Sequence, residues 1–253
     1  MSEARNALVR PVPDSYDRCV RSNREEISVV LAKKQHAEYC RTLKQLGLKL
    51  IPIDADNTLP DSCFVEDTAA VFGEKAVICN MKTESRAKEV IEVAKALSKL
   101  RDTYYIKPPA TIDGGDILKA EDTVFVGLTA RTNLHAVKQL EGILAKSDFK
   151  VASVRVHDVL HLKSACTYLG DNCVIVAEGF FDTDLLHNYR KIVVPKGDEY
   201  AADCLAVNGT ILVAKGYPKT KKSIERAGFL IRELDVSEFR KGDGALTCLS
   251  ILL

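Results

Sequence analysis

Short hydrophobic runs recur along the chain in pairs, and each pair is followed by a segment with helical periodicity. In the first copy, residues 67–80 (DTAAVFGEKAVICN) predict two strands joined by a tight turn. Residues 85–100 then place apolar side chains at helical spacing, and residues 103–108 predict a third strand. The chain therefore contains a strand–strand–helix–strand unit of about 45–50 residues, a length typical of repeat architectures.

Three further copies of this unit follow. Their predicted hairpins, helical segments and closing strands are 116–128, 132–146 and 149–156; 164–178, 182–189 and 191–195; and 203–215, 219–229 and 230–236. Two hydrophobic runs remain without a partner, residues 7–12 (ALVRPV) and residues 244–253 (GALTCLSILL). We predict that they combine into a fifth unit, which closes the chain into a five-bladed α/β propeller without exposed sheet edges. The alternative is an ordinary α/β sheet in which the internal similarity is accidental.

The bulk composition favours a single globular domain over residues 1–253. Hydrophobic residues make up 46% of the chain and charged residues 28%, and the formal net charge is +1. This charge balance does not point to nucleic acid as a partner. The sequence has no run of about eighteen apolar residues that predicts a membrane span, and its N-terminal segment MSEARNALVR carries charges where a secretory signal is apolar. We therefore expect a cytoplasmic protein, either a monomer or a homodimer.

Eight cysteines are spread over the sequence without a CxxC pair, and we expect most of them to be small, buried and reduced. His157 and His161 have the i, i+4 spacing of a helical metal pair, with Cys166 and Cys173 nearby. A zinc-binding module is therefore a competing hypothesis. However, residues 151–156 predict a strand that runs into a loop, and the glutamate of an HExxH motif is missing.

The unusual polar residues fall at one place in the repeat, the start of the first strand. They are Glu66 and Asp67 in the first unit, residues 113–116 (DGGD) in the second, residues 161–164 (HLKS) in the third, and Thr247 and Cys248 in the C-terminal run. Equivalent positions of a ring converge at its axis, so these side chains are predicted to share one cavity. Each also has a structural alternative: Cys248 as a core residue, His161 as a hydrogen-bonded structural histidine, and DGGD as an ordinary turn whose glycines supply positive φ.

The predicted set is chemically coherent. A nucleophilic cysteine needs thiolate character and a proton shuttle, which a histidine with an orienting acid provides. Additional carboxylates oppose a thiolate unless the substrate itself is a cation. Because a planar guanidinium presents forked N–H donors to pairs of carboxylate oxygens, the set points to a guanidinium or amidinium substrate.

Four motifs resemble those of the dimethylarginine dimethylaminohydrolases. These motifs are residues 59–67 (LPDSCFVED), 112–118 (IDGGDIL), 161–164 (HLKS) and 243–248 (DGALTC). That family belongs to the guanidine-modifying (pentein) superfamily together with the arginine deiminases, and the resemblance extends over essentially the whole chain. It implies the five-bladed fold and the hydrolysis of Nω-methylated arginines to citrulline and methylamines through a covalent cysteine intermediate, without a metal or organic cofactor.

The resemblance also assigns roles to individual residues. Cys248 is implied to be the nucleophile, His161 the general acid and base, and Asp113 the residue that orients the imidazole. The implied substrate-binding residues are Glu66 and Asp67 for the guanidinium, Arg86 and Arg131 for the α-carboxylate, Asp61 and the backbone around Gly242 and Asp243 for the α-amino group, Phe64 in the pocket wall, and Val20 on a mobile flap. Asp116 is expected to cap the Gly–Gly turn.

Two positions depart from the family pattern. Leu249 stands where some members have a second cysteine, and Gly242 is smaller than the usual valine, which is expected to loosen the α-amino site. A structural alternative for Arg86 and Arg131 is a solvated position in the first turn of a helix, where a positive charge is unfavourable.

Two further functional alternatives remain open. A deiminase that acts on free arginine uses the same residues and differs only in the room it leaves for N-methyl groups. The second alternative is a protein that uses the ring only to bind a ligand and does not catalyse a reaction.

Overall fold

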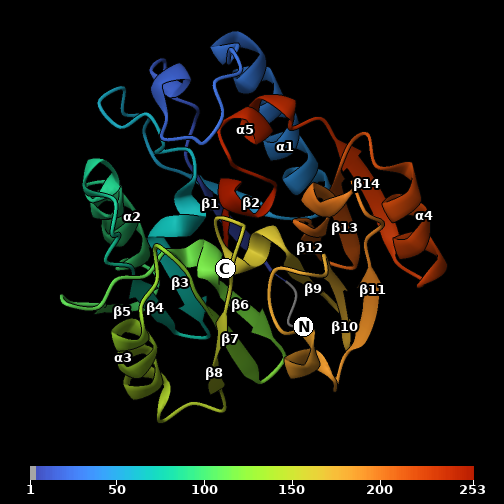
Figure 1. The fold of residues 1–253 in the computed structure, drawn as a ribbon. Coiled ribbons are helices and arrows are strands. Elements are labelled where there is room, and N and C mark those ends of the chain that lie inside the picture. The colour runs from blue at the N-terminus through green and yellow to red at the C-terminus, as the bar shows by residue number, and fades with distance from the viewer. Residues whose placement is uncertain (1–3) are drawn as a thin grey trace.

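Five three-stranded sheets make up the computed structural model, which describes residues 4–253. In every sheet, two strands pair antiparallel and a third strand pairs parallel to the middle one. Figure 1 shows the sheets arranged around a central axis, with helices on the outside of the ring. The predicted fivefold repeat of α/β units is confirmed.

The first four units follow the chain in order. The first unit consists of β3 (Ala69–Phe72), β4 (Lys75–Ile78), α2 (Val90–Leu97) and β5 (Asp102–Tyr105), and the second of β6 (Ile117–Ala120), β7 (Thr123–Leu128), α3 (Leu134–Leu144) and β8 (Lys150–Arg155). The third unit consists of β9 (Cys166–Gly170), β10 (Cys173–Val176), η6 (Thr183–Leu186) and β11 (Arg190–Val193). The fourth consists of β12 (Leu205–Val207), β13 (Thr210–Ala214), α4 (Pro218–Arg226) and β14 (Leu230–Leu234). The third unit has only a 3-10 turn, η6, where the others have an α-helix.

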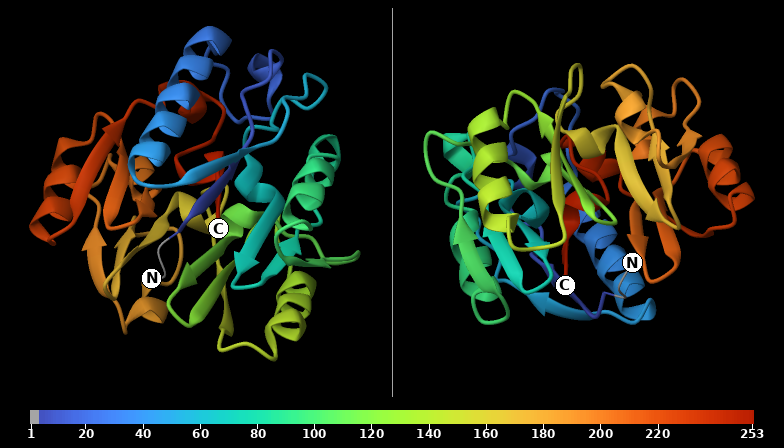
Figure 2. Two further views of the ribbon diagram at one scale, coloured as in Figure 1. Left: turned by 180° about the vertical axis from the view of Figure 1, so that it is seen from behind. Right: turned by 90° about the horizontal axis from the view of Figure 1, so that it is seen from below.

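The two ends of the chain form the fifth unit, as predicted. β1 (Asn6–Val9) pairs antiparallel with β15 (Ile251–Leu252) and parallel with β2 (Lys49–Pro52). Figure 2 shows this N-terminal strand beside the C-terminal residues in both views. The sequence pattern did not identify the two remaining elements of the unit, β2 and the helix α1 (Val29–Gln45) that precedes it.

Local sequence explains where these elements begin and turn. The Ser28 side chain accepts a hydrogen bond from the Leu31 N–H and so caps α1. The buried α1 residues Ala32, Tyr39 and Leu43 recur at helical spacing and pack into the core. In the β12–β13 hairpin, the turn residues Asn208 and Gly209 have φ values of 44° and 81°, as a two-residue hairpin turn requires.

A short 3-10 turn stands shortly before the first strand of every unit. These turns are η2 (Val65–Thr68), η4 (Gly114–Asp116), η5 (Leu162–Ser164), η7 (Glu199–Ala202) and η8 (Thr247–Leu249). η2 contacts η4 and η8, η4 contacts η5, and η5 contacts η7. The five turns are therefore linked in the order η7, η5, η4, η2 and η8 around the axis. All except η7 contain or directly follow residues singled out in the sequence. α5 (Ser237–Lys241) packs against α1 next to this centre.

All eight cysteines are free, and seven of them are buried, which agrees with their predicted reduced, core-like character. Among residues 4–253, helices that are long and apolar enough to cross a membrane do not occur.

Candidate active site

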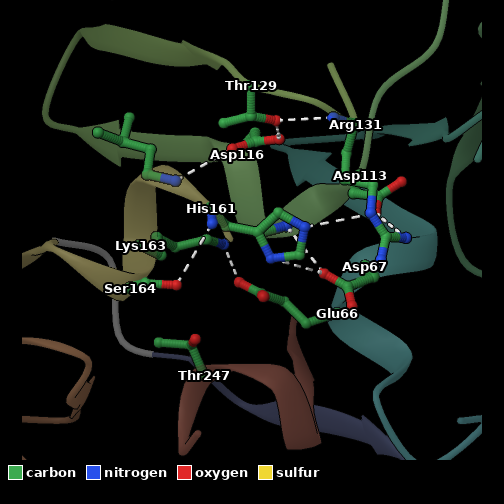
Figure 3. Close-up of polar contacts among 12 residues, drawn as sticks. Glu66, Asp67, Asp113, Asp116, Thr129, Arg131, His161, Lys163, Ser164 and Thr247 are labelled. Carbon is green, nitrogen blue, oxygen red and sulfur yellow. Dashed lines mark hydrogen bonds and ion pairs between the residues drawn. The ribbon is translucent and has the colours of Figure 1, made fainter. Parts of the chain in front are cut away.

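His161 lies between two carboxylates at the centre of the ring (Figure 3). Its Nε2 is 3.3 Å from Oδ2 of Asp113, and its Nδ1 is 3.8 Å from Oδ1 of Asp67. Burial alone would lower the pKa of His161, but Asp67, Asp116 and Asp113 outweigh it and raise the pKa to about 9. The imidazole is therefore a charged proton donor at neutral pH. Asp113 therefore lies beside the imidazole, and its role in orienting His161 stays a prediction.

The two glycines of DGGD allow this close approach. A Cβ atom at Gly114 would lie 1.9 Å from the carbonyl oxygen of Glu66, and one at Gly115 would lie 2.5 Å from His161 Nδ1. Neither glycine has a positive φ among the residues described. The structural alternative of an ordinary turn with positive φ is therefore wrong here. Glycine is required because η2 and His161 leave no room for a side chain.

Asp67 is held by a buried ion-pair network. Its Oδ2 accepts a 2.9 Å hydrogen bond from Arg86 Nη1, and its Oδ1 accepts the Gly115 N–H. Arg86 also binds Glu89 through Nε and Nη2. Although burial favours the neutral acid, the nearby His161 and Arg86 charges lower the pKa of Asp67.

Arg86 is buried, so the solvated alternative for this residue is wrong. A guanidinium has five N–H bonds, and the contacts with Asp67 and Glu89 leave one on each terminal nitrogen. Arg131 is more accessible: its side chain is 16% exposed and its Nη1 lies 3.6 Å from Asp113 Oδ2. Both arginines thus reach the carboxylates around His161, with Arg131 nearer to solvent.

Glu66 forms an ion pair with Lys163, the third residue of the HLKS motif (Figure 3). The sequence alone assigned Lys163 no role in the site. Both side chains are largely buried, and Oε2 of Glu66 has no hydrogen-bond partner among residues 4–253. Burial lowers the pKa of Lys163 to about 8, opposed by the charges of Asp203 and Cys248. A buried acceptor without a donor is available to a ligand.

Cys248 lies in η8, and its side chain is buried. The preceding residue, Thr247, donates its hydroxyl to Asp203 Oδ1 over 2.9 Å and its N–H over 3.3 Å. Burial first, and then the charges of Asp203 and Asp67, raise the pKa of the Cys248 thiol well above its ordinary value. The thiol is therefore protonated in the free protein, and a bound cation would favour its thiolate.

Asp203 is the second site residue that sequence reasoning missed. It opens the fourth unit two residues before β12, as Asp67 opens the first unit two residues before β3. The shared register was the signal that could have identified it. Burial raises the pKa of Asp203 to about 6.

Asp116 is structural, but it does not cap the Gly–Gly turn as expected. Its carboxylate accepts hydrogen bonds from the hydroxyls of Thr129 and Thr132 and from the Leu162 N–H, at 2.8, 2.6 and 3.0 Å. It therefore joins the loop after β7 to η5 and fixes the residue that follows His161.

The predicted flap is tied to both candidate α-amino ligands. The Val20 N–H donates to the Asp61 carboxylate at 3.1 and 3.2 Å, and the Ser22 hydroxyl donates to Asp243 at 2.9 Å. The Val20 side chain itself is exposed. Opening this segment would release Asp61 and Asp243 for another donor.

Two close contacts shape the wall beside the flap. The Phe64 ring would lie 2.3 Å from a Cβ atom on Gly244, and the Tyr16 hydroxyl 2.4 Å from one on Gly242. Tyr16 thus fills the space that a larger residue at position 242 would take. The expectation that Gly242 loosens the α-amino site is therefore wrong.

The zinc hypothesis fails on geometry. Residues 150–155 form β8, so His157 and His161 do not share a helix. The His157 side chain is exposed and lies 3.0 Å from Asp158, whereas His161 is buried between carboxylates. Groups of three or more potential metal ligands are not found in the described part of the chain.

A cysteine, a histidine and paired carboxylates that meet at the axis of a five-unit ring define a cysteine-dependent hydrolase of the guanidine-modifying class. The model of the family described as N,N dimethylarginine dimethylhydrolase, eukaryotic, matches residues 10–201. The chain belongs to the dimethylarginine dimethylaminohydrolase family, which confirms the resemblance seen in the sequence.

Individual relatives agree with this membership. The chain is 33% identical over 222 residues to the N(G),N(G)-dimethylarginine dimethylaminohydrolase of Pseudomonas aeruginosa, with 87% of each chain covered. It is 36% identical over 254 residues to the enzyme of the same name from Streptomyces coelicolor, covering 99% of this chain and 97% of that one. A solved structure of a cysteine-to-serine variant of the Pseudomonas aeruginosa enzyme, complexed with citrulline, superposes with a TM-score of 0.96 at 30% identity and covers 99% of this chain and all of that one.

Proposed function

We propose that this protein hydrolyses Nω-methylated arginines to citrulline and methylamines, with Cys248 as the nucleophile. The observation that carries the proposal is the placement of His161 between Asp113 and Asp67, where Asp67 lies on the turn η2 that contacts η8, the turn of Cys248. The citrulline complex of the related Pseudomonas aeruginosa enzyme supports the product.

Substrate recognition rests on the carboxylates and arginines at the axis. The free Oε2 of Glu66 and the remaining lone pairs of Asp67 accept N–H bonds from the substrate's guanidinium. Arg131, with the two uncommitted N–H bonds of Arg86, binds the α-carboxylate. Asp61 and Asp243 take the α-amino group when the flap that carries Val20 moves, and Phe64 with the backbone of Gly242 closes the wall.

The first half of the reaction forms a covalent intermediate. The bound guanidinium lowers the pKa of Cys248, the thiol proton leaves to solvent, and the thiolate sulfur bonds to the guanidinium carbon. The adduct is a neutral tetrahedral species. The His161 imidazolium then donates its proton to the methylated nitrogen, the C–N bond breaks, and the amine departs from a cationic thiouronium.

The second half uses the same histidine as a base. Neutral His161 takes a proton from water while the water oxygen bonds to the thiouronium carbon. The C–S bond then breaks and the electron pair returns to sulfur. The hydroxyl proton passes to the Cys248 thiolate, which leaves citrulline and regenerates the thiol. Asp113 holds the imidazole in position and stabilises its charged form through both steps.

Product analysis tests the proposal. Purified protein is incubated with asymmetric dimethylarginine and, separately, with arginine, and citrulline is measured. We expect citrulline from dimethylarginine and its loss in Cys248→Ser, whereas Cys40→Ser, at the one cysteine that is only partly buried among those described, retains activity. Citrulline from arginine alone would assign the protein to deimination instead, and labelling by a haloacetamidine at another cysteine would refute Cys248 as the nucleophile.

A cytoplasmic location, action without a metal or cofactor, and a monomeric or homodimeric state complete the proposal. The eight free cysteines are consistent with a reducing compartment. Subcellular fractionation and light scattering of the purified protein test the first and last of these, and activity after exhaustive dialysis against a chelator tests the second.

A further inference from the structure

Lys163 is a buried cation at the centre of the site that the proposed reaction leaves unused. It lies in η5 between His161 and Ser164, and Ser164 closes this turn through a reciprocal hydrogen-bond pair with His161. The Lys163 side chain is 13% exposed, and its ammonium pairs with Oε1 of Glu66. A lysine is rarely buried unless it is paired, so this position has a specific use for the charge.

The ring places Lys163 in the same register as two assigned residues. β3 begins at residue 69, β9 at 166 and β15 at 251, so Glu66, Lys163 and Cys248 each lie three residues before the first strand of their unit. Their turns all belong to the ring of turns around the axis. The three side chains are therefore structural equivalents that enter one site from three units.

The surroundings of Cys248 are otherwise acidic. The carboxylates of Asp67 and Asp203 raise the pKa of the Cys248 thiol, and the Lys163 ammonium lowers it. A Cys248 thiolate in turn raises the pKa of Lys163 and of the phenols of Tyr39 and Tyr200. The charged His161 lies beside Asp67. In a site of low dielectric, a single positive charge among carboxylates strongly lowers the free-energy cost of forming a thiolate.

We propose that Lys163 is a positioning and charge-balancing residue: it holds Glu66 through Oε1, leaves Oε2 for the guanidinium of the substrate, and offsets the carboxylates around Cys248. The inference rests on the assignment of Cys248 as the nucleophile. It assigns to Lys163 no contact with the reacting carbon.

The test measures the rate of Cys248 alkylation by iodoacetamide between about pH 5.5 and 7, where Lys163, with a pKa of about 8, still carries its charge, and peptide mapping identifies the labelled cysteine. Lys163→Met should move the apparent pKa of Cys248 up by at least about one unit, so that alkylation below the pKa slows roughly tenfold. Lys163→Arg should remain within about threefold of wild type because it keeps the charge. Lys150→Met, at an exposed ion pair with Asp122, is the matched control and should leave the profile unchanged.

Glu66→Gln gives the opposite perturbation. It removes a negative charge and leaves Lys163 without its partner, so the apparent pKa of Cys248 should fall. In the double variant Lys163→Met/Glu66→Gln, the apparent pKa of Cys248 should lie between the values of the two single variants. Circular dichroism checks folding. If Lys163→Met fails to fold because it strands a buried carboxylate, the Glu66→Gln and double variants still decide the matter.

Unchanged alkylation profiles in Lys163→Met and Glu66→Gln, or shifts of the same sign, would overturn the inference. Alkylation does not require turnover. A wild-type protein that is labelled at Cys248 but yields no citrulline from dimethylarginine therefore refutes the proposed function while leaving the Lys163 result valid.

Discussion

Gly115→Ala probes the placement of His161 by adding one methyl group. The new Cβ would lie 2.5 Å from His161 Nδ1 and 3.0 Å from Asp67 Oδ1, whereas ordinary contacts begin at 3.4 Å. The imidazole, or the turn that carries residue 115, must therefore move by roughly 0.9 Å. Because an overpacked core typically costs about 1–3 kcal/mol, the protein should lose that much stability, which corresponds to a decrease in Tm of roughly 2–12 °C for a chain of this size.

The effect on catalysis should be larger than the effect on stability. A misplacement of about 1 Å in a catalytic group typically costs on the order of 100-fold in rate. We therefore expect kcat for citrulline formation from dimethylarginine to fall by about that factor, while alkylation of Cys248 still occurs because the nucleophile lies on a different turn.

Steady-state kinetics and thermal denaturation check the prediction. Gly142→Ala in α3 is the matched control, since a Cβ there meets no atom within 4 Å and a helical alanine should stabilise by about 0.5–1 kcal/mol. If Gly115→Ala keeps kcat within threefold of wild type, the imidazole is not held by this contact or is not the proton donor, and the reasoning fails.

Three other outcomes follow from the same contacts. The folded-state pKa of His161 is raised from 6.5 to about 9. Its charge therefore stabilises the fold fully below about pH 6.5 and progressively less as the pH rises through 9. His161→Gln should accordingly flatten the decline of Tm between these pH values. Arg86→Met strands the carboxylates of Asp67 and Glu89 in the core and should cost about 3–5 kcal/mol in urea unfolding, whereas Lys95→Met at the exposed pair with Glu92 should cost under about 1 kcal/mol. Deletion of residues 251–253 removes β15 and its pairing with β1, so amide exchange in β1 should accelerate and citrulline formation should fall at least tenfold.

Local patterns in the sequence were sufficient to predict most of the fold. A hairpin followed by a helix and a parallel strand leaves a signature in the spacing of apolar residues, and four units carry it. The fifth unit was predicted only through its unpaired ends. β2 escaped the pattern because it is short and only partly buried, so its side chains do not alternate clearly between apolar and polar. α1 escaped it because its buried face includes the polar residues Gln35, His36 and Thr42, which weaken the helical spacing of apolar positions.

The sequence by itself also determined which turns carry the chemistry, since residues in equivalent positions of a repeat must converge at the axis. It did not determine which side chains pair there. The contacts of Glu66 with Lys163, of His161 with Asp67, and of Tyr16 with the space beside Gly242 join residues from different units or distant loops. Periodicity specifies the face on which a side chain lies, but the separation between charges on different units depends on how the units pack, and only the tertiary structure decides it.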